Sequence, residues 1–303
     1  MGSVIAMSAV APRFLRDESP EQLERLYQQA RGLGDNVNAT VYFERLAASR
    51  HRDLSESPNF DDAKLAIVAS FQPKSGGTFL HNRLVELGYQ EFGWCFPHFQ
   101  CHSYWYASER TLDLYLQGGA ACQTHFRPDP ALLALFDRCG VEKIWVHLRN
   151  PIESTISAYH HYRGEGQGEG AVGAQRRREA LHAAQMFRFL RRSSKDRFIR
   201  EQIDWSVEWT RQWLRFDAEQ PGRVVFSYHR ELADSQRMLN RVFREFGVES
   251  PGRSTPSPAA NDRFRANPLR NWRNDLAAST QRFLEQRVKE SLAKFPAFER
   301  LWT

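Results

Sequence analysis

The segment FQPKSGGTFL, residues 71–80, combines residue types that together can hold an anion. One lysine supplies positive charge, two hydroxyl side chains can donate hydrogen bonds, and two adjacent glycines let the backbone approach a bound group closely. These residues are Lys74, Ser75, Gly76, Gly77 and Thr78. They predict a site for a phosphate-like group, and a plain glycine turn with an exposed lysine is the alternative.

The residues on either side of this segment predict that it joins a strand to a helix. Residues 64–71, KLAIVASF, form a short continuous apolar run, which is typical of a strand buried on both faces. After the glycines, Leu80, Leu84 and Leu87 recur on one helical face, and Gly88 suits the end of a helix. Unpaired backbone N–H groups in the first turn of that helix favour an anion in front of them.

A second group of candidate residues follows the apolar run KIWVHL. Asn150 is a favourable N-cap, Pro151 suits the first helical position, and Glu153 completes a capping box, so a helix is predicted to begin here. Arg149 ends the strand and Ser157 lies about two turns along the helix, so both side chains can converge on one anion. A capped helix with an arginine beside it is the alternative.

These two segments resemble the cytosolic sulfotransferase family. PKSGGTFL, in which the lysine precedes the glycines, is similar to the PKSGTTW loop that binds the 5′ end of 3′-phosphoadenosine-5′-phosphosulfate (PAPS). LRNPIESTISAYHHY is similar to LRNPKDVxVSxYHF, whose arginine and serine hold the 3′-phosphate. The resemblance implies that residues 74–78 hold the 5′ end of PAPS, and that Arg149 and Ser157 hold its 3′-phosphate.

The resemblance also implies contacts with the adenine of PAPS. Phe79 stands where the family has a tryptophan that stacks on the base, and this change keeps a flat apolar face. Core packing is the alternative for this side chain. Tyr228 resembles the tyrosine of the family's YEDL segment, but YHREL is one residue longer, so His229 takes that place under a shifted alignment.

A C-terminal segment extends the resemblance in part. RFRANPLRNWRNDLAASTQ is similar to the family's RKGxxGDWKNxxTxxQ loop when Trp272 and Asn274 are aligned with its Trp and Asn. This alignment implies that Arg265 grips the 3′-phosphate, with Ala266 and Asn267 beside it as further nucleotide contacts. Arginines that merely solvate a C-terminal loop are the alternative.

His125, in CQTHFRP, is the candidate catalytic base. It ends a predicted strand, where active-site residues of open α/β sheets gather, and an imidazole with a pKa of ~6.5 can accept a proton from an alcohol. It resembles the catalytic histidine of the family's KTHLP segment. Gln123 replaces the lysine of that segment, so the resemblance leaves the charge near the sulfonate to Lys74 or to an arginine.

Composition and element order predict the fold class. The chain has 303 residues, of which 41% are hydrophobic, and this suits one large α/β domain. We expect a P-loop-like parallel sheet flanked by helices. Its candidate strands are residues 64–71, 120–126, 143–148 and 223–228.

The chain is predicted to have one main domain with a helical extension before it. SPEQLERLYQQARGLG places Ser19 and Gln22 in capping-box arrangement at the start of an amphipathic helix. We expect the extension to cover residues 1–60 and the sulfotransferase domain to cover 61–303. No apolar run approaches ~18 residues and no secretory signal is recognised, so a cytoplasmic enzyme without a membrane span is expected.

The net charge, the cysteine spacing and the aromatic residues limit the classes of ligand that the sequence suits. The net charge is +6, and 36 of the 42 basic residues are arginine, which suits an anionic ligand or a nucleic acid. The four cysteines form no C-x-x-C pair, so no metal is expected, although HFQCH is a residual candidate. The aromatic residues 92–106 are predicted to line the acceptor side, and the Gly-rich residues 164–173 to form a lid over it.

The hypothesis from sequence is a PAPS-dependent sulfotransferase that transfers a sulfuryl group to a hydroxyl of a small-molecule, lipid or carbohydrate acceptor. His125 would act as the general base, and Lys74 would stabilise charge on the leaving oxygen. A P-loop small-molecule kinase is one alternative, although the G-K-[ST] order is missing. A non-catalytic nucleotide- or RNA-binding module, suggested by the arginine content, is the other. No nucleic-acid partner is expected.

Overall fold

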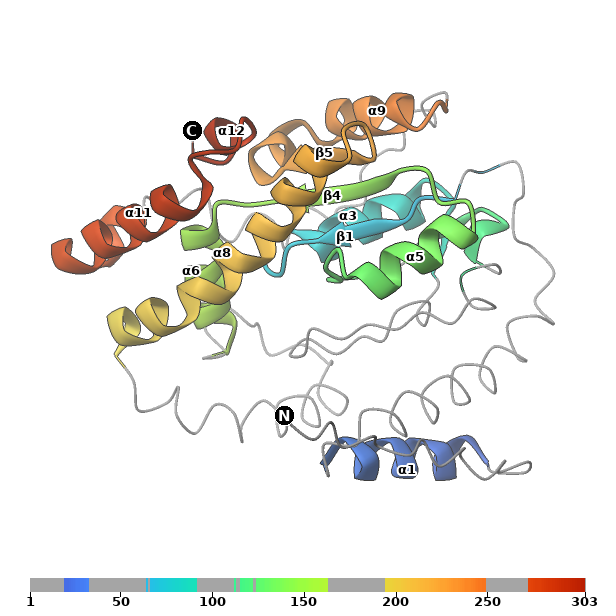
Figure 1. Ribbon diagram of the computed structural model, residues 1–303, viewed down its shortest axis with the longest axis horizontal. Helices are drawn as coiled ribbons and strands as arrows, with labels where there is room; N and C mark the ends of the chain where they lie inside the picture. The colour runs from blue at the N-terminus through green and yellow to red at the C-terminus, as the bar shows by residue number, and fades with distance from the viewer. Residues whose placement is uncertain are drawn as a thin grey trace, which may run out of the picture.

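The computed structural model describes residues 19–32, 64, 66–91, 112, 115–121, 124–162, 194–248 and 272–302 (Figure 1). The helices are α1 (Pro20–Gly32), α3 (Gly77–Glu86), α5 (Pro130–Arg138), α6 (Pro151–Tyr162), α8 (Lys195–Glu219), α9 (Ser235–Glu245), α11 (Ala278–Leu292) and α12 (Phe298–Trp302). Two 3₁₀ turns are η1 (His229–Asp234) and η2 (Trp272–Asp275). The strands are β1 (Ala69–Phe71), β2 (Gln90–Glu91), β3 (Ala120–Ala121), β4 (Ile144–Leu148) and β5 (Val224–Tyr228).

Three of these strands form a parallel sheet in the order β1-β4-β5. Phe71 lies opposite His147, and Leu148 lies opposite Tyr228, so the carboxyl ends of the three strands meet at one edge. Strands β2 and β3 pair separately as a short parallel ribbon. The predicted α/β class, with a parallel sheet flanked by helices, is therefore confirmed.

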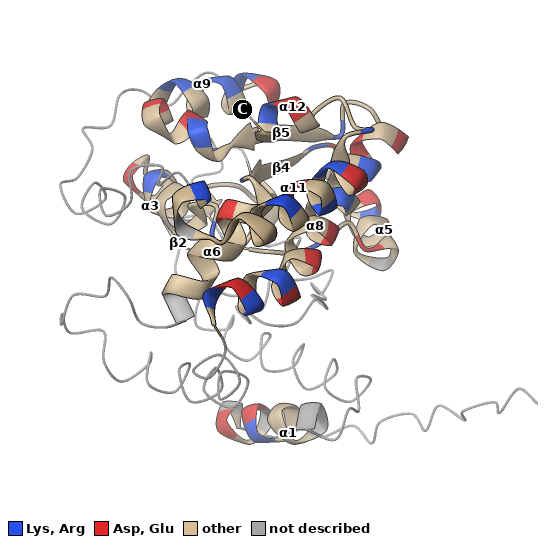
Figure 2. Ribbon diagram, turned by 90° about the vertical axis from the view of Figure 1, so that its left-hand side faces the viewer, with Lys and Arg blue, Asp and Glu red and all other residues tan. Residues whose placement is uncertain are grey.

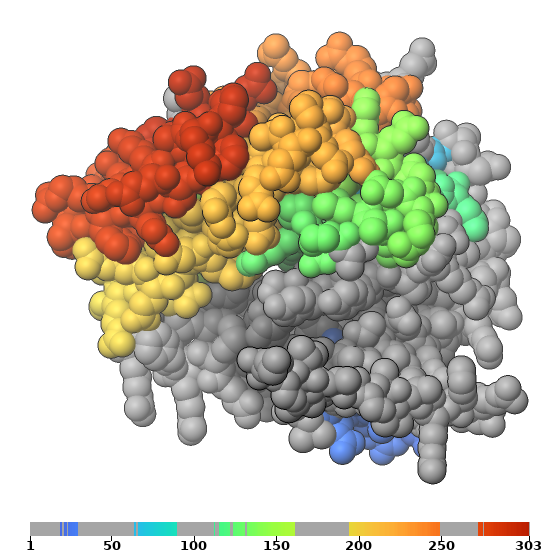
Figure 3. Space-filling model, viewed as in Figure 1, coloured from blue at the N-terminus to red at the C-terminus, as the bar shows by residue number. Residues whose placement is uncertain are grey.

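Helices cover both faces of the sheet, and each face has its own hydrophobic cluster. On one face, Val146 of β4 packs with Trp209 and Trp213 of α8, in a cluster that also includes residues of α5, α6 and α11. Figure 3 shows α11 against the first turns of α8. On the other face, Trp145 packs with residues of α3 and α9, among them Leu80. Figure 2 shows Lys and Arg interspersed with Asp and Glu along the outer helices.

The strand predictions are confirmed at two places and corrected at two. The predicted strands at 143–148 and 223–228 are β4 and β5, whereas the run at 64–71 is a strand only over Ala69–Phe71. Among the described residues of the predicted strand 120–126, Ala120–Ala121 form a strand, which pairs with β2, and residues 124–126 do not. Residues 124–126 lie beside β1 instead. Hydroxyl groups replace part of the backbone ladder there, because Ser70 Oγ donates to Phe126 O at 2.7 Å.

Capping at the helix starts is mostly as predicted. Ser19 and Gln22 form the reciprocal capping box of α1, at 2.9 and 3.3 Å. Asn150 Oδ1 accepts from Ile152 N at 2.9 Å, as an N-cap of α6 should. The predicted box with Glu153 is wrong, because this carboxylate accepts from Arg149 Nε at 3.2 Å. Among the described residues, no helix is long and apolar enough to cross a membrane.

Candidate functional site

The residues that follow β1, β4 and β5 come together at the carboxyl edge of the sheet, where ligands of open α/β sheets bind. Gln72, immediately after β1, is fully buried and links the strand ends. Its backbone N–H donates to His147 O at 2.9 Å, and its Oε1 accepts from the backbone N–H of Arg149 at 2.7 Å. The loop of residues 72–76 and the start of α6 are therefore held against each other.

Three successive carbonyl oxygens of this loop accept hydrogen bonds from side chains on its β4 and β5 side. The contacts are Ser154 Oγ to Pro73 O (2.6 Å), Arg149 Nη1 to Lys74 O (3.0 Å) and His229 Nδ1 to Ser75 O (2.6 Å). In a trans peptide the carbonyl and the following N–H point in opposite directions. The N–H groups of Lys74 and Gly76 therefore point away from these donors. The N–H of Ser75 is used within the loop, because it donates to Gln72 O at 3.0 Å.

A buried hydrogen-bond chain supports the Ser75 carbonyl from the sheet. Trp145 Nε1 donates to Ser227 Oγ at 2.7 Å, and Ser227 Oγ lies 2.7 Å from His147 Nδ1. His147 Nε2 in turn lies 3.0 Å from Ser75 O. Burial, with the charge of Arg149 as a smaller cause, lowers the pKa of His147 to about 3, so the ring is neutral. The carbonyl can only accept, so Nε2 carries the proton and Nδ1 accepts from the Ser227 hydroxyl.

The sequence analysis missed His147 and Ser227. The signal for them was present, because each is a polar residue near the end of an otherwise apolar strand, in KIWVHL and RVVFSY. The two residues lie opposite each other in the β4–β5 register. Polar side chains buried at paired positions are hydrogen-bonded, so they mark a structural or functional contact. The sequence could not indicate that the contact is with the loop.

Two cations are partly buried at this edge. Lys74 is the one non-glycine residue with a left-handed backbone, φ 63°, in the described part of the chain. Burial first, and then the positive charge of Arg149, lowers the pKa of Lys74 to about 8. Burial also lowers the pKa of Arg149, although Glu153 opposes this shift. Both charges are therefore unfavourable in the free protein, and a bound anion would stabilise them.

The N-terminus of α3 is open to such an anion. Gly76 is its N-cap, no side chain caps it, and no acidic residue lies in its first turn. A Cβ at Gly76 would lie 2.7 Å from Leu232 Cδ1, so the close packing of the loop needs glycine. Ser75 Oγ is buried and has no hydrogen-bond partner in the described part of the chain. An orphaned hydroxyl, an uncapped helix and two partly buried cations fit a phosphate or sulfate ligand.

His125 lies beside the strand that leads into this loop. Its Nδ1 is 2.6 Å from Phe71 O, the carbonyl of the last residue of β1. The carbonyl only accepts, so Nδ1 carries the proton, and in the neutral form of this tautomer the lone pair is on Nε2. Trp209 Nε1 of α8 donates to His125 O at 3.1 Å and fixes the backbone. The structure thus brings His125 and the anion loop to the same edge.

The remaining predicted nucleotide contacts on these two helices, α3 and α6, are described by their exposure and packing. Thr78 is exposed in the first turn of α3, and Phe79 is partly buried against the cluster that includes Leu80. Ser157 is partly buried on α6, one turn after Glu153 on the same side of the helix. Their roles in nucleotide binding stay predictions.

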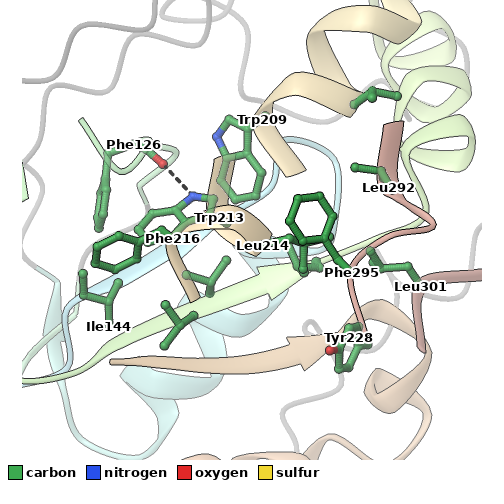
Figure 4. Packing of buried hydrophobic residues seen from close by; sticks show 14 of the residues in the cluster. Phe126, Ile144, Trp209, Trp213, Leu214, Phe216, Tyr228, Leu292, Phe295 and Leu301 are labelled. Carbon is green, nitrogen blue, oxygen red and sulfur yellow. Dashed lines mark hydrogen bonds between the residues drawn. The ribbon is translucent and has the colours of Figure 1, made fainter. Parts of the chain in front are cut away.

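The structure separates the two residues considered for the adenine. Tyr228 is 4% exposed and lies in the larger hydrophobic cluster, near Phe295 and Leu301 (Figure 4). Burial, as the largest cause, raises its pKa. His229 instead contacts the loop through Ser75 O, and burial, then Arg149, lowers its pKa to about 4. The assignment of Tyr228 to the adenine stays a prediction.

Several predicted features lie outside the described residues. They are Gln123, Arg265, Ala266, Asn267, the aromatic residues 92–106 and the Gly-rich residues 164–173. Trp272, which anchors the alignment of the C-terminal segment, is described and is buried in the larger cluster. Within the described ranges, no group of three or more His, Cys, Asp or Glu residues could hold a metal ion.

Comparisons with known proteins give likenesses to solved structures alone. No known protein family matches the chain, and no curated protein matches it. Among solved structures, the crystal structure of mouse sulfotransferase SULT7A1 complexed with PAP is similar to this chain, with a TM-score of 0.49 and 12% sequence identity. The likeness covers 80% of this chain and 90% of that chain.

Proposed function

We propose that this protein is a PAPS-dependent sulfotransferase that transfers a sulfuryl group to a hydroxyl acceptor. The observation that carries the proposal is the geometry of the loop of residues 72–76. Side-chain donors hold its carbonyl oxygens on one side. Two partly buried cations and the start of α3, which has no side-chain cap, lie beside it. Such a site recognises a doubly or triply charged oxyanion. The order of residues in PKSGGTFL and LRNPIESTISAYHHY, which resembles the sulfotransferase pattern, supports PAPS as the particular ligand.

The residues at the sheet edge would divide the work as follows. Lys74, Ser75 and the N-terminus of α3 would hold the 5′ end of the nucleotide, and Arg149, with Ser157, would hold the 3′-phosphate. PAPS supplies an activated sulfuryl group whose S–O bond to the 5′-phosphate is the one that breaks. As the acceptor oxygen bonds to sulfur, its proton would pass to Nε2 of His125. Charge left on the 5′-phosphate oxygen would be stabilised by Lys74 and by the loop N–H groups.

The test is transfer of labelled sulfate from PAPS to a panel of phenols, alcohols and sugars by the His125→Ala variant. We expect turnover to fall about 10²- to 10⁴-fold, because the general base is lost. The affinity for 3′-phosphoadenosine 5′-phosphate, measured by calorimetry, should stay within about threefold of wild type. His160→Ala, on α6, is the matched histidine control. Equal losses of turnover in both variants would contradict the role given to His125.

The alternatives from sequence are separated by ligand titration. PAPS, ATP with Mg²⁺ and a short RNA are titrated at low and high salt. A sulfotransferase binds PAPS more tightly than ATP, whereas a kinase reverses this order. Nonspecific RNA binding should fall steeply with salt, because it releases condensed counterions.

A further inference from the structure

Helix α8 crosses the carboxyl edge of the sheet next to the candidate catalytic histidine. Ser206 Oγ accepts from Gln72 Nε2 at 2.9 Å, directly at the start of the anion loop. One turn further on, Trp209 Nε1 donates to His125 O at 3.1 Å. The turn of α8 over residues 205–209 therefore contacts both the start of the loop of residues 72–76 and the segment that includes His125.

Trp205 occupies this turn but differs from the tryptophans that follow it. Trp209 and Trp213 are fully buried, and Figure 4 shows Trp213 next to Phe126, with Trp209 on its other side. Trp205 is four residues before Trp209, hence on nearly the same side of α8, yet 40% of its side chain is exposed. A large aromatic ring is thus left accessible on α8, one turn before the tryptophan that donates to His125 O.

A cation lies over this ring. The guanidinium of Arg127, two residues after His125 in the chain, has its Cζ 5.6 Å from the centroid of the Trp205 ring. A guanidinium at this distance interacts with the indole face and is held in place by it. Its planar fork also suits a carboxylate. The pair combines a flat apolar surface with a positive charge at its rim.

We propose that Trp205 and Arg127 form the acceptor subsite, and that they select a hydroxylated ring with a carboxylate substituent. The ring would stack on Trp205 and its carboxylate would pair with Arg127, which offsets repulsion from the charged donor. The assignment of this surface to an acceptor rests on the proposed function. Aromatic acids and uronic acids share this chemistry, and the experiment below distinguishes them.

The test measures binding of matched acid and neutral probes to the full chain. The pairs are 4-hydroxybenzoate with its methyl ester, and methyl glucuronide with methyl glucoside, each titrated calorimetrically with saturating 3′-phosphoadenosine 5′-phosphate. In wild type, the acid of at least one pair should bind about tenfold more tightly than its neutral partner. Trp205→Ala should weaken both members of that pair about tenfold. Arg127→Gln should abolish the preference for the acid and leave the affinity of the neutral probe unchanged.

The chain offers a matched control on the neighbouring helix. Phe283 of α11 is 39% exposed, and Arg200 Cζ lies 4.9 Å from its ring centroid. Phe283→Ala and Arg200→Gln should change no probe affinity. The proposal is overturned if wild type prefers neither acid, or if Trp205→Ala behaves as Phe283→Ala. If the proposed function is wrong, a different result is expected. The acids would still bind in a way that depends on Trp205 and Arg127, but labelled sulfate would be transferred to no probe.

Discussion

Helices α3 and α9 pack on the same face of the sheet, but their N-termini are built in opposite ways. At α9, Asp234 Oδ1 accepts from Arg237 N at 3.1 Å, so the helix supplies its own negatively charged cap. At α3, the N-cap is Gly76, which has no side chain to accept from the first turn, and Lys74 lies two residues before it. The positive end of one helix dipole is neutralised by the chain, and that of the other is reinforced with further positive charge.

The difference separates a structural helix start from a binding one. An aspartate cap stabilises a helix by about 1 kcal/mol, and sequences usually provide such a residue. Cations beside a helix N-terminus instead destabilise the free protein. The hydrogen bonds to the carbonyl oxygens of residues 73–75 maintain this arrangement, and a bound anion would offset the unfavourable positive charge. The comparison therefore predicts which substitutions change affinity and which change only stability.

Replacing Lys74 should have the largest effect on affinity. Lys74→Met is expected to weaken binding of 3′-phosphoadenosine 5′-phosphate about 100-fold, because a charged hydrogen bond to a desolvated anion contributes up to about 3 kcal/mol. The free variant should unfold at higher denaturant concentration than wild type, because a partly buried charge is removed. Calorimetry and denaturant titration measure the two effects. Lys289→Met, on α11, is the control. Equal affinity losses in both variants would contradict the assignment of an anion site to the N-terminus of α3.

The pH dependence should follow the lowered pKa of Lys74, about 8. Nucleotide binding needs the charged ammonium, so affinity should fall about tenfold between pH 7 and pH 9 and binding near pH 8 should take up protons. Stability of the free protein should rise as pH increases from about 8 toward the ordinary value of 10.5, because the unfolded chain binds more protons there. Calorimetry in buffers of different ionisation enthalpy detects the uptake. Lys74→Met should remove both effects.

Removing the support for the loop carbonyl should have a moderate effect. His229→Ala deletes one of the two donors to Ser75 O, the other being His147, so the N–H of Gly76 is less well oriented, and nucleotide affinity should fall about fivefold. His229→Asn keeps an N–H donor near the same position and should restore most of the affinity. A structural role alone would give equal affinities in both variants after correction for the folded fraction. Titration of the two variants with 3′-phosphoadenosine 5′-phosphate decides this.

Substitution of the α9 cap should leave affinity unchanged. Asp234→Ala is expected to reduce the free energy of unfolding by about 1 kcal/mol, because the first turn of α9 loses its acceptor. Nucleotide affinity should remain that of wild type. Loss of affinity in this variant would mean that the two N-termini are coupled, and that α3 is not the separate binding element described above. Urea titration and calorimetry on one preparation give both values.

Most of the fold could be predicted from local sequence patterns. Continuous apolar runs predicted β4 and β5 nearly to the residue, and Ser19 with Gln22 predicted the start of α1. The prediction failed at the described residues 124–126, which were expected to continue the strand that begins at Ala120 and do not. Ser70 and the Thr124–Phe126 segment are joined partly by a side-chain hydroxyl there, a pairing between distant segments that no local pattern encodes.

The sequence by itself determined the chemical character of the loop that includes residues 74–78, because a lysine, two hydroxyl residues and two glycines between an apolar run and a helix predict a site for an anion. Only the tertiary structure decided what the loop contacts. The chain of hydrogen bonds from Trp145 to Ser75 joins residues 70 or more positions apart, and the lowered pKa of Lys74 depends on its burial beside Arg149. Desolvation and long-range hydrogen bonds depend on which segments are adjacent in the folded chain. The order of the residues alone does not specify this.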